Sequence, residues 1–216
     1  MTYLIITCSL NENNPDHIKR KRRLDRYDYC ISSTLELIKK YNLNIVPIIV
    51  ENNGFRETFL NKFKCKILYT NNNNKNLWHK GCKEMEDIKD AIKHFNIEPD
   101  DTIIKLTGRY RIYRPDFLNL VIRNNNNYKC FIKFFNVATK KYHINHNDCI
   151  LGLFAIKSKY LLNFDNYKEK MGSPEEQFAI FVRDFIKLEN VYKIESDLKV
   201  ECNFNAAKPP TRLHYF

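Results

Sequence analysis

The chain has 216 residues, 44% of them hydrophobic, which is enough for a folded domain with a sizeable core and excludes a disordered chain. A formal net charge of +11 favours an anionic partner, and nucleic acid, a membrane surface and a nucleotide-sugar all satisfy that charge. No apolar run reaches about 18 residues, so no membrane span is expected, and residues 1–7 are predicted to form a first strand and not a signal peptide.

The first half of the chain alternates short apolar runs with segments of helical spacing. Residues 3–8 are predicted to form a buried strand, residues 11–26 a basic loop that is mobile or ordered by a ligand, and residues 27–41 a helix. The elements predicted next, in order, are a strand at 44–50 in which Pro47 indicates an edge or a bulge, a short helix at 56–63, a strand at 65–69, a helix at 81–95 and a strand at 102–106. Four strands separated by helices predict an α/β fold with a Rossmann-like, mostly parallel central sheet flanked by helices.

The second half changes character. A helix is predicted at 115–122, strands at 130–135 and 149–156, and a helix at 173–188. The last helix is well marked, because Ser173 and Glu176 form a capping box and Pro174 occupies the first helical position. Neither a linker nor an internal repeat is present, so residues 1–216 are expected to form one domain.

The 7 cysteines are odd in number and scattered, and no CxxC pair occurs. This pattern disfavours a zinc site or a disulfide framework, and no metal site is predicted from it. It favours a reducing compartment such as the cytoplasm and a soluble protein.

Polar residues follow the predicted parallel strands at the points where they end. Thr7 and Ser9 follow the first strand, and Glu51 and Asn52 follow the second. The carboxyl ends of such strands line one crevice, where ligands of open α/β sheets bind. Thr7 and Ser9 are candidates to touch a base or a ribose. Glu51 is either an acceptor for a ribose or base N–H group or a solvated turn residue.

The segment from Lys105 to Arg111 ends the 102–106 strand in a glycine turn, at Gly108, that is surrounded by cations. Lys105, Arg109 and Arg111 suit phosphate oxygens, and without an anion they would repel one another. Lys80 and Gly81 open the preceding helix, whose N-terminus is a second candidate anion site or simply a capped helix start. Glu84 is either functional or only well placed in the first turn.

Several segments carry a family resemblance, in this order: TCS at 7–9, a basic segment leading to Tyr27, VENNG at 50–54, HKGCKE at 79–84, IIKLTGRYRI at 103–112, DCILGLFAIKSKYL at 148–161 and PEEQFA at 174–179. Together they resemble small glycosyltransferases of the GT-A type, which occur in surface-polysaccharide gene clusters and in large DNA viruses. The resemblance implies a Rossmann-like GT-A fold. It also implies a nucleotide-sugar donor, first of all a UDP-sugar, bound by residues 1–112, and a glycan or glycoconjugate acceptor bound by residues 113–216. For a viral protein it would place the chain in the host cytoplasm or the virion. The predicted donor-binding residues are Thr7, Ser9, Arg23, Glu51, Asn52, Lys80, Gly81, Lys105, Thr107, Gly108, Arg109 and Tyr110.

One position departs from that family. GT-A enzymes usually carry an Asp-x-Asp after the fourth strand to hold Mn²⁺ or Mg²⁺, and this chain has Lys105, Thr107 and Arg109 there. The pair Asp100 and Asp101 lies before the strand, at its opposite end. No metal cofactor is therefore firmly predicted, and we expect cations of the protein to neutralise the leaving diphosphate.

An inverting transfer also needs a base for the acceptor hydroxyl, and a carboxylate is the usual choice. The start of the PEEQFA helix resembles the place where GT-A enzymes present it, so Glu175 and Glu176 are the candidates. Glu176 also fits a purely structural role in the capping box. Asp148 is a weaker candidate for the base or for acceptor binding.

Two other functions remain open. A sugar-phosphate nucleotidyltransferase shares the Rossmann-like start, but it would need a glycine-rich loop after the first strand, and residues 9–12 contain no glycine. A non-catalytic nucleic-acid-binding module would use the cations of residues 20–26. No nucleic-acid-binding motif accompanies them, so nucleic acid is not the expected partner.

Overall fold

The computed structural model describes residues 1–10, 16–136, 139–142, 145–165, 172–202 and 214–215. Its largest sheet has seven strands in the order β10-β6-β9-β4-β1-β2-β3. The bounds of these strands are β1 Thr2–Cys8, β2 Val46–Glu51, β3 Lys66–Tyr69, β4 Thr102–Thr107, β6 Cys130–Ile132, β9 Leu153–Lys157 and β10 Val191–Lys193. β1 pairs in parallel with β2 and β4, whereas β9 runs antiparallel to β4 and β6. The predicted α/β fold with a mostly parallel sheet is confirmed.

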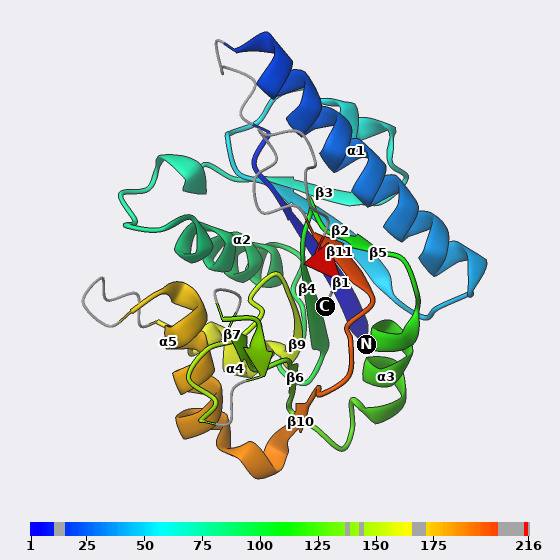
Figure 1. Ribbon diagram of the computed structural model, residues 1–216. Coiled ribbons are helices and arrows are strands. Elements are labelled where there is room, and N and C mark those ends of the chain that lie inside the picture. Colours follow the sequence, from blue (N-terminus) through cyan, green and yellow to red (C-terminus); the bar gives the residue numbers. More distant parts are fainter. Residues whose placement is uncertain (11–15, 137–138, 143–144, 166–171, 203–213, 216) are drawn as a thin grey trace.

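Helices cover both faces of this sheet (Figure 1). α1 (His17–Lys40) and α3 (Asp116–Asn124) pack on one face, and α2 (Lys80–His94), α4 (Ser158–Leu162) and α5 (Pro174–Phe181) on the other. The described residues also contain shorter helical segments: η1 (Phe59–Lys62), η2 (Asn72–Asn74), η4 (Val182–Lys187, π-helical) and η5 (Leu188–Asn190). Among the described helices, none has the length and the apolar character needed to cross a bilayer.

Strand alternation assigns each side chain to one face. Ile5 of β1 and Ile103 of β4 belong to the core beneath α2 and α5. Side chains two residues apart on a strand point to the same face. Thr7, Lys105 and Thr107 therefore also point toward α2, and they do so at the carboxyl ends of β1 and β4. This places three polar side chains of the sheet under the start of a helix.

Two small sheets flank the large one. β5 (Arg111–Ile112), β11 (Val200–Cys202) and β12 (His214–Tyr215) form an antiparallel sheet, and β7 (Phe135–Asn136) pairs with β8 (Lys141–Tyr142). The first of these brings Glu201 beside two arginines. Its carboxylate lies 2.8 Å from Arg26 and 3.5 Å from Arg111.

The prediction of a loop over residues 11–26 is wrong from His17 onward, because α1 begins there. Asp16 caps the helix, and its side chain accepts a hydrogen bond from the Lys19 N–H. Tyr27 and Ile31 pack inward, while the lysines and arginines of the first turns face outward or lie half-buried. The helix was missed because its first turns are rich in lysine and arginine, and its buried residues begin only at Tyr27. Residues 11–15 lie outside the described residues.

Other predicted bounds also change. The short helix at 56–63 is reduced to the 3₁₀ turn η1, and the strand predicted at 130–135 ends at Ile132. The strand predicted to begin at residue 149 begins at Leu153. α5 has the predicted capping box and N-terminal proline but ends at Phe181, where η4 follows. Pro47 lies in β2 opposite Leu4 of β1, and β3 pairs with β2 only from Ile48 onward, so Pro47 needs no bulge.

Candidate functional site

A cavity of about 220 Å³ lies at the carboxyl end of β4, between the starts of α2 and α5. It is lined by residues from both halves of the chain. Seven of them were predicted from the sequence: Lys80, Gly81, Lys105, Thr107, Arg109, Tyr110 and Glu175. Of the three strand ends that were expected to line one crevice, that of β4 lines this hollow, whereas Thr7, Ser9, Glu51 and Asn52 are not among its described lining residues.

An ion pair forms the floor of this cavity. The ammonium of Lys105 lies 2.6 Å from Oε2 of Glu84, and it also donates to Thr107 Oγ1 at 2.6 Å and to the Leu151 carbonyl at 2.9 Å. Thr7 and Thr107 donate their hydroxyls to the same Glu84 oxygen, at 3.1 and 3.0 Å. Lys105 is only 1% exposed. Burial at that depth requires the hydrogen bonds and the counter-charge that surround it.

The anion that balances the cations near Gly108 is thus part of the protein. Burial raises the pKa of Glu84, but the charges of Lys105 and Arg109 and the hydrogen bonds from Lys105 and Thr107 outweigh it, so the pKa lies below its ordinary value. Glu84 is ionised at neutral pH. Arg111 faces Glu201 and donates to Ser33 Oγ at 3.0 Å, outside this cavity. The prediction that these cations would repel one another without a bound anion is wrong, because Glu84 and Glu201 supply negative charge beside Lys105 and Arg111.

The sequence left the role of Glu84 open, although a signal for it was present. Glu84 lies one turn before Ile88, which belongs to the inward stripe of α2. A carboxylate on the buried face of an amphipathic helix must find a buried partner. The register of β1 and β4 places that partner, Lys105, on the same side of the sheet.

The starts of α2 and α5 touch at the rim of the cavity. A Cβ atom on Gly81 would lie 3.0 Å from Cβ of Pro174, so glycine permits this contact. His79 caps α2 by accepting the Gly81 N–H on Nδ1. Both helices present their N-terminal ends here, where the helix dipole favours negative charge.

The two glutamates of the PEEQFA helix have different environments. Glu175 lines the cavity. Glu176 accepts the Ser173 N–H at 2.6 Å, and its own N–H donates to Ser173 Oγ at 3.2 Å, which completes the predicted capping box. Asp148 accepts the N–H of Cys149 at 2.7 Å and is not among the described residues that line the cavity.

Two glycines allow the backbone to pack tightly at the cavity wall. A Cβ atom on Gly152 would lie 2.0 Å from the ring of Tyr110, and one on Gly108 would lie 2.8 Å from Sγ of Cys8. Gly108 was predicted to let a ligand approach, and the structure shows it against β1, with its N–H donating to the Thr7 carbonyl at 2.9 Å. Gly152 was not singled out in the sequence, because it lay within a predicted strand.

Ser9 and Arg23 form a separate group beside the end of β1. The guanidinium of Arg23 donates twice to the Ser9 carbonyl, at 2.9 and 2.8 Å, and packs over the ring of Tyr27. The Ser9 N–H donates to the Tyr27 hydroxyl at 3.2 Å. These contacts fix the chain as it leaves β1.

Glu51 and Asn52 lie at the end of β2 in hydrogen bonds within the protein. The Glu51 carboxylate is fully buried and accepts from Leu10 N–H, from Asn53 and from Arg56. Asn52 donates its amide to Asp87 of α2 at 2.9 Å. Both residues therefore brace the loops around the strand ends.

The carboxylates at the end of β4 do not fit a divalent cation. The Glu84 carboxylate, which lies there, is already paired with the ammonium of Lys105 at 2.6 Å. Mg²⁺ and Mn²⁺ prefer several oxygen ligands, carboxylates above all. Within the described residues, no group of three or more His, Cys, Asp or Glu side chains is placed to hold a metal ion.

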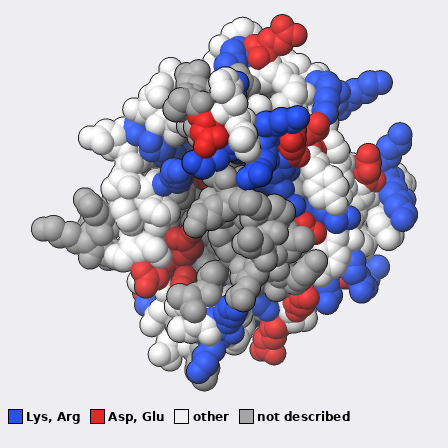
Figure 2. Space-filling view, turned by 45° about the horizontal axis from the view of Figure 1, so that its top comes forward, with Lys and Arg blue, Asp and Glu red and all other residues white. Residues whose placement is uncertain are grey.

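Figure 2 shows lysine and arginine side chains gathered over the upper part of the face seen there. α1 contributes exposed cations to the surface, among them Lys19, Lys21 and Arg22. Such a surface raises the local concentration of anions.

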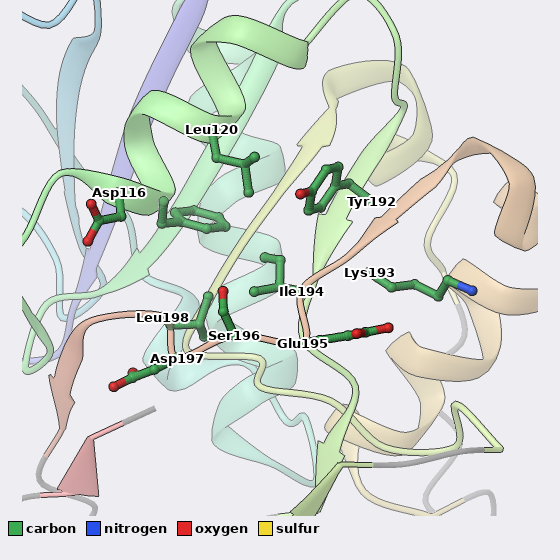
Figure 3. Close-up of a pocket in the computed structure, with 10 residues that line it drawn as sticks. Asp116, Leu120, Tyr192, Lys193, Ile194, Glu195, Ser196, Asp197 and Leu198 are labelled. Atoms are coloured by element: carbon green, nitrogen blue, oxygen red, sulfur yellow. The ribbon is translucent and has the colours of Figure 1, made fainter.

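A second hollow, of about 550 Å³, lies between α3 and the segment that follows β10 (Figure 3). Leu120, Ile194 and Leu198 form its inner surface, while Asp116 and Glu195 direct their carboxylates away from each other. Its polar groups do not converge, so the cavity at the end of β4 is the better candidate site.

No protein-family model matches the sequence, and no curated protein matches it. Solved structures resemble the fold. A putative nucleotide-diphospho-sugar transferase from Desulfovibrio desulfuricans superposes with a TM-score of 0.58 at 10% identity, covering 89% of this chain and 79% of that one. The bifunctional IspDF of Campylobacter jejuni gives a TM-score of 0.54 at 13% identity over 90% of this chain and 49% of that one. A putative glucose-1-phosphate thymidylyltransferase from Bacillus anthracis gives 0.52 at 11% identity, over 90% and 86%. At these identities the likeness concerns the fold.

Proposed function

We propose that this protein is a glycosyltransferase that moves a sugar from a nucleotide-sugar, first of all a UDP-sugar, to a hydroxyl of a glycan or glycoconjugate. The observation that carries the proposal is the composition of the cavity at the end of β4. Lys80 and Arg109 from residues 1–112 and Glu175 from residues 113–216 line one hollow. The names of the similar structures, which include a nucleotide-diphospho-sugar transferase, support the same class of donor.

The first half of the chain holds the donor. Lys80 and Arg109 line the cavity at the N-terminus of α2, and in this proposal they bind the diphosphate. As the bond from the anomeric carbon to the phosphate oxygen breaks, negative charge grows on that oxygen. Fixed cations and helix N–H groups stabilise it without reorganising.

The second half holds the acceptor. Its hydroxyl oxygen forms the new bond to the anomeric carbon, and Glu175 accepts the hydroxyl proton. Direct displacement of this kind inverts the configuration. Glu175 is preferred over Glu176, because the Glu176 carboxylate is already used in the cap of α5. Asp148 remains a candidate for acceptor binding.

A sugar-phosphate nucleotidyltransferase is the second candidate, and the likeness to the thymidylyltransferase fold favours it. Such an enzyme releases pyrophosphate from a nucleoside triphosphate. A glycosyltransferase instead releases a nucleoside diphosphate from a nucleotide-sugar. The products therefore separate the two functions.

The test is a product assay on the purified protein. UDP-glucose, UDP-galactose, UDP-N-acetylglucosamine and GDP-mannose are each supplied with a panel of oligosaccharide acceptors, with Mn²⁺ or with EDTA. We expect one donor to yield nucleoside diphosphate and an extended glycan. In Glu175→Gln the turnover should fall by at least about a hundredfold. The matched variant Glu176→Gln should keep most of its turnover and its cap, because the amide oxygen can still accept the Ser173 N–H. Pyrophosphate release from a triphosphate and a sugar phosphate would overturn the proposed function. Full activity in Glu175→Gln would overturn the role of Glu175 as the base.

A further inference from the structure

We infer that Glu84 binds the transferred sugar, accepting a hydrogen bond from one of its hydroxyl or amino groups on Oε1. The inference rests on the proposed function and adds a specificity-determining residue to it. The two oxygens of the Glu84 carboxylate have different surroundings. Oε2 receives three hydrogen bonds, from Thr7, Thr107 and Lys105.

The second oxygen, Oε1, has different surroundings. Within the part of the chain that the structure describes, no hydrogen bond reaches Oε1 of Glu84. The side chain is 24% exposed and lines the cavity. Since Oε2 is enclosed by its three donors, the part of the carboxylate open to the cavity is Oε1. An ionised oxygen in such a place accepts hydrogen bonds and donates none.

Because Oε1 of Glu84 accepts hydrogen bonds only, the part of the nucleotide-sugar beside it must donate one. A phosphate oxygen would be repelled by the carboxylate, whereas Lys80 and Arg109 suit the diphosphate. A sugar hydroxyl or amino group supplies the missing donor. The donor's sugar ring therefore lies over Glu84, with the diphosphate toward the two cations.

The surroundings of Glu84 also make it selective. Its position is fixed from three elements: β1 through Thr7, β4 through Lys105 and Thr107, and α2 through its own backbone. If the bound sugar lacks the hydroxyl or amino group that Oε1 binds, this fixed oxygen is left without a hydrogen bond in the cavity. Enzymes that hydrogen-bond a substrate hydroxyl discriminate strongly against analogues that lack it for this reason. The transferred sugar is thus one with a free hydroxyl or amino group at one particular carbon.

The experiment separates the sugar's contribution from that of the nucleotide. Binding is measured by calorimetry for UDP, for UDP-glucose and for its 2-, 3-, 4- and 6-deoxy analogues, or for the corresponding set of the donor with the highest turnover in the product assay. Each ligand is titrated into wild type and into Glu84→Asp, which keeps the charge beside Lys105 and withdraws the carboxylate by one methylene. Glu86→Asp is the control, because Glu86 lies on the same helix and faces Lys75 and Lys89. Thermal unfolding confirms that each variant is folded.

We expect one deoxy analogue to bind wild type about ten- to a hundredfold more weakly than the parent donor. Glu84→Asp should weaken the parent by a similar factor, leave that analogue unchanged and leave UDP unchanged, while Glu86→Asp binds all ligands as wild type does. Equal weakening of UDP and of the parent donor in Glu84→Asp would overturn the inference and leave Glu84 a purely structural role. Equal binding of all deoxy analogues to wild type would also overturn it. Failure of the proposed function is distinct, since the product assay would then show no nucleoside diphosphate from any donor.

Discussion

Replacing Lys105 with methionine tests whether the ion pair beneath the cavity holds the strand ends and α2 together. Methionine has nearly the same length and no charge. The substitution removes the ammonium that lies 2.6 Å from Glu84 and leaves that carboxylate with the hydroxyls of Thr7 and Thr107 and the more distant charge of Arg109. Breaking a buried pair by removing one partner typically costs about 3–5 kcal/mol. Because the Glu84 side chain is 24% exposed and can recover some water, we expect the lower end, about 3 kcal/mol.

The loss should depend on pH. Removing Lys105 takes away two of the causes that hold the pKa of Glu84 below its ordinary value, while burial, which raises that pKa, and the charge of Arg109 stay. The folded-state pKa of Glu84 should therefore be higher in the variant, so the folded variant keeps its proton to a higher pH than folded wild type does. The variant is therefore least handicapped near pH 4, and its deficit relative to wild type grows as the pH rises toward 7.

The assay is urea unfolding followed by circular dichroism and by the fluorescence of the single tryptophan, Trp78. The double variant Lys105→Met with Glu84→Met removes both charges and should recover much of the loss, because an apolar pair often matches a buried ion pair in stability. A cost of the single variant below about 1 kcal/mol would refute the reasoning, since that is the worth of a surface pair. So would a double variant no more stable than the single one.

Three further predictions concern residues around the site. Burial raises the pKa of Asp87 to about 7, although hydrogen bonds from Thr70, Asn72 and Asn52 act to lower it. Between about pH 4 and 7 the folded state therefore holds a proton that the unfolded chain has lost. Stability should fall as the pH rises through that window, and Asp87→Asn should remove this part of the dependence in urea unfolding; an equally steep fall in the variant would contradict the assignment. Gly152→Ala should cost about 1–3 kcal/mol, because its Cβ would lie 2.0 Å from the Tyr110 ring, and an unchanged melting temperature would show that the ring moves freely. Ser173→Ala should cost about 1 kcal/mol through loss of the α5 cap, measured by thermal unfolding, and no change would mean that the cap contributes little.

The sheet was predictable because its strands are short apolar runs with clear breaks. Residues 3–8 and 102–106 are found within one residue of the predicted bounds, as β1 and β4. Alternation then determines which side chains face α2. What the sequence does not show is the partner of each polar side chain. Lys105 was expected to face a phosphate, yet it is buried and paired with Glu84, which is 21 residues earlier in the chain.

Where local signals misled, long-range contacts decided the outcome. The basic sequence of the first turns of α1, taken alone, is typical of a loop. Tyr27 and Ile31 pack the later turns against the sheet, and the helix extends back to its Asp16 cap. Residues 149–152, which were predicted to begin a strand, line the cavity instead. That change depends on Tyr110, whose ring fills the space beside Gly152. Neither contact has a signature in the local sequence.

The most direct test of the account is a calorimetric titration of UDP into wild type, Lys80→Ala and Lys83→Ala, in buffer with EDTA and again with Mn²⁺. Lys80 and Lys83 share the first turn of α2, but only Lys80 lines the cavity, while Lys83 donates to the Asn73 carbonyl. We expect binding that survives EDTA, weakens about tenfold or more in Lys80→Ala and is unchanged in Lys83→Ala. Binding that requires Mn²⁺, or that is the same in all three proteins, would contradict a diphosphate site built from cations of the protein at the end of β4.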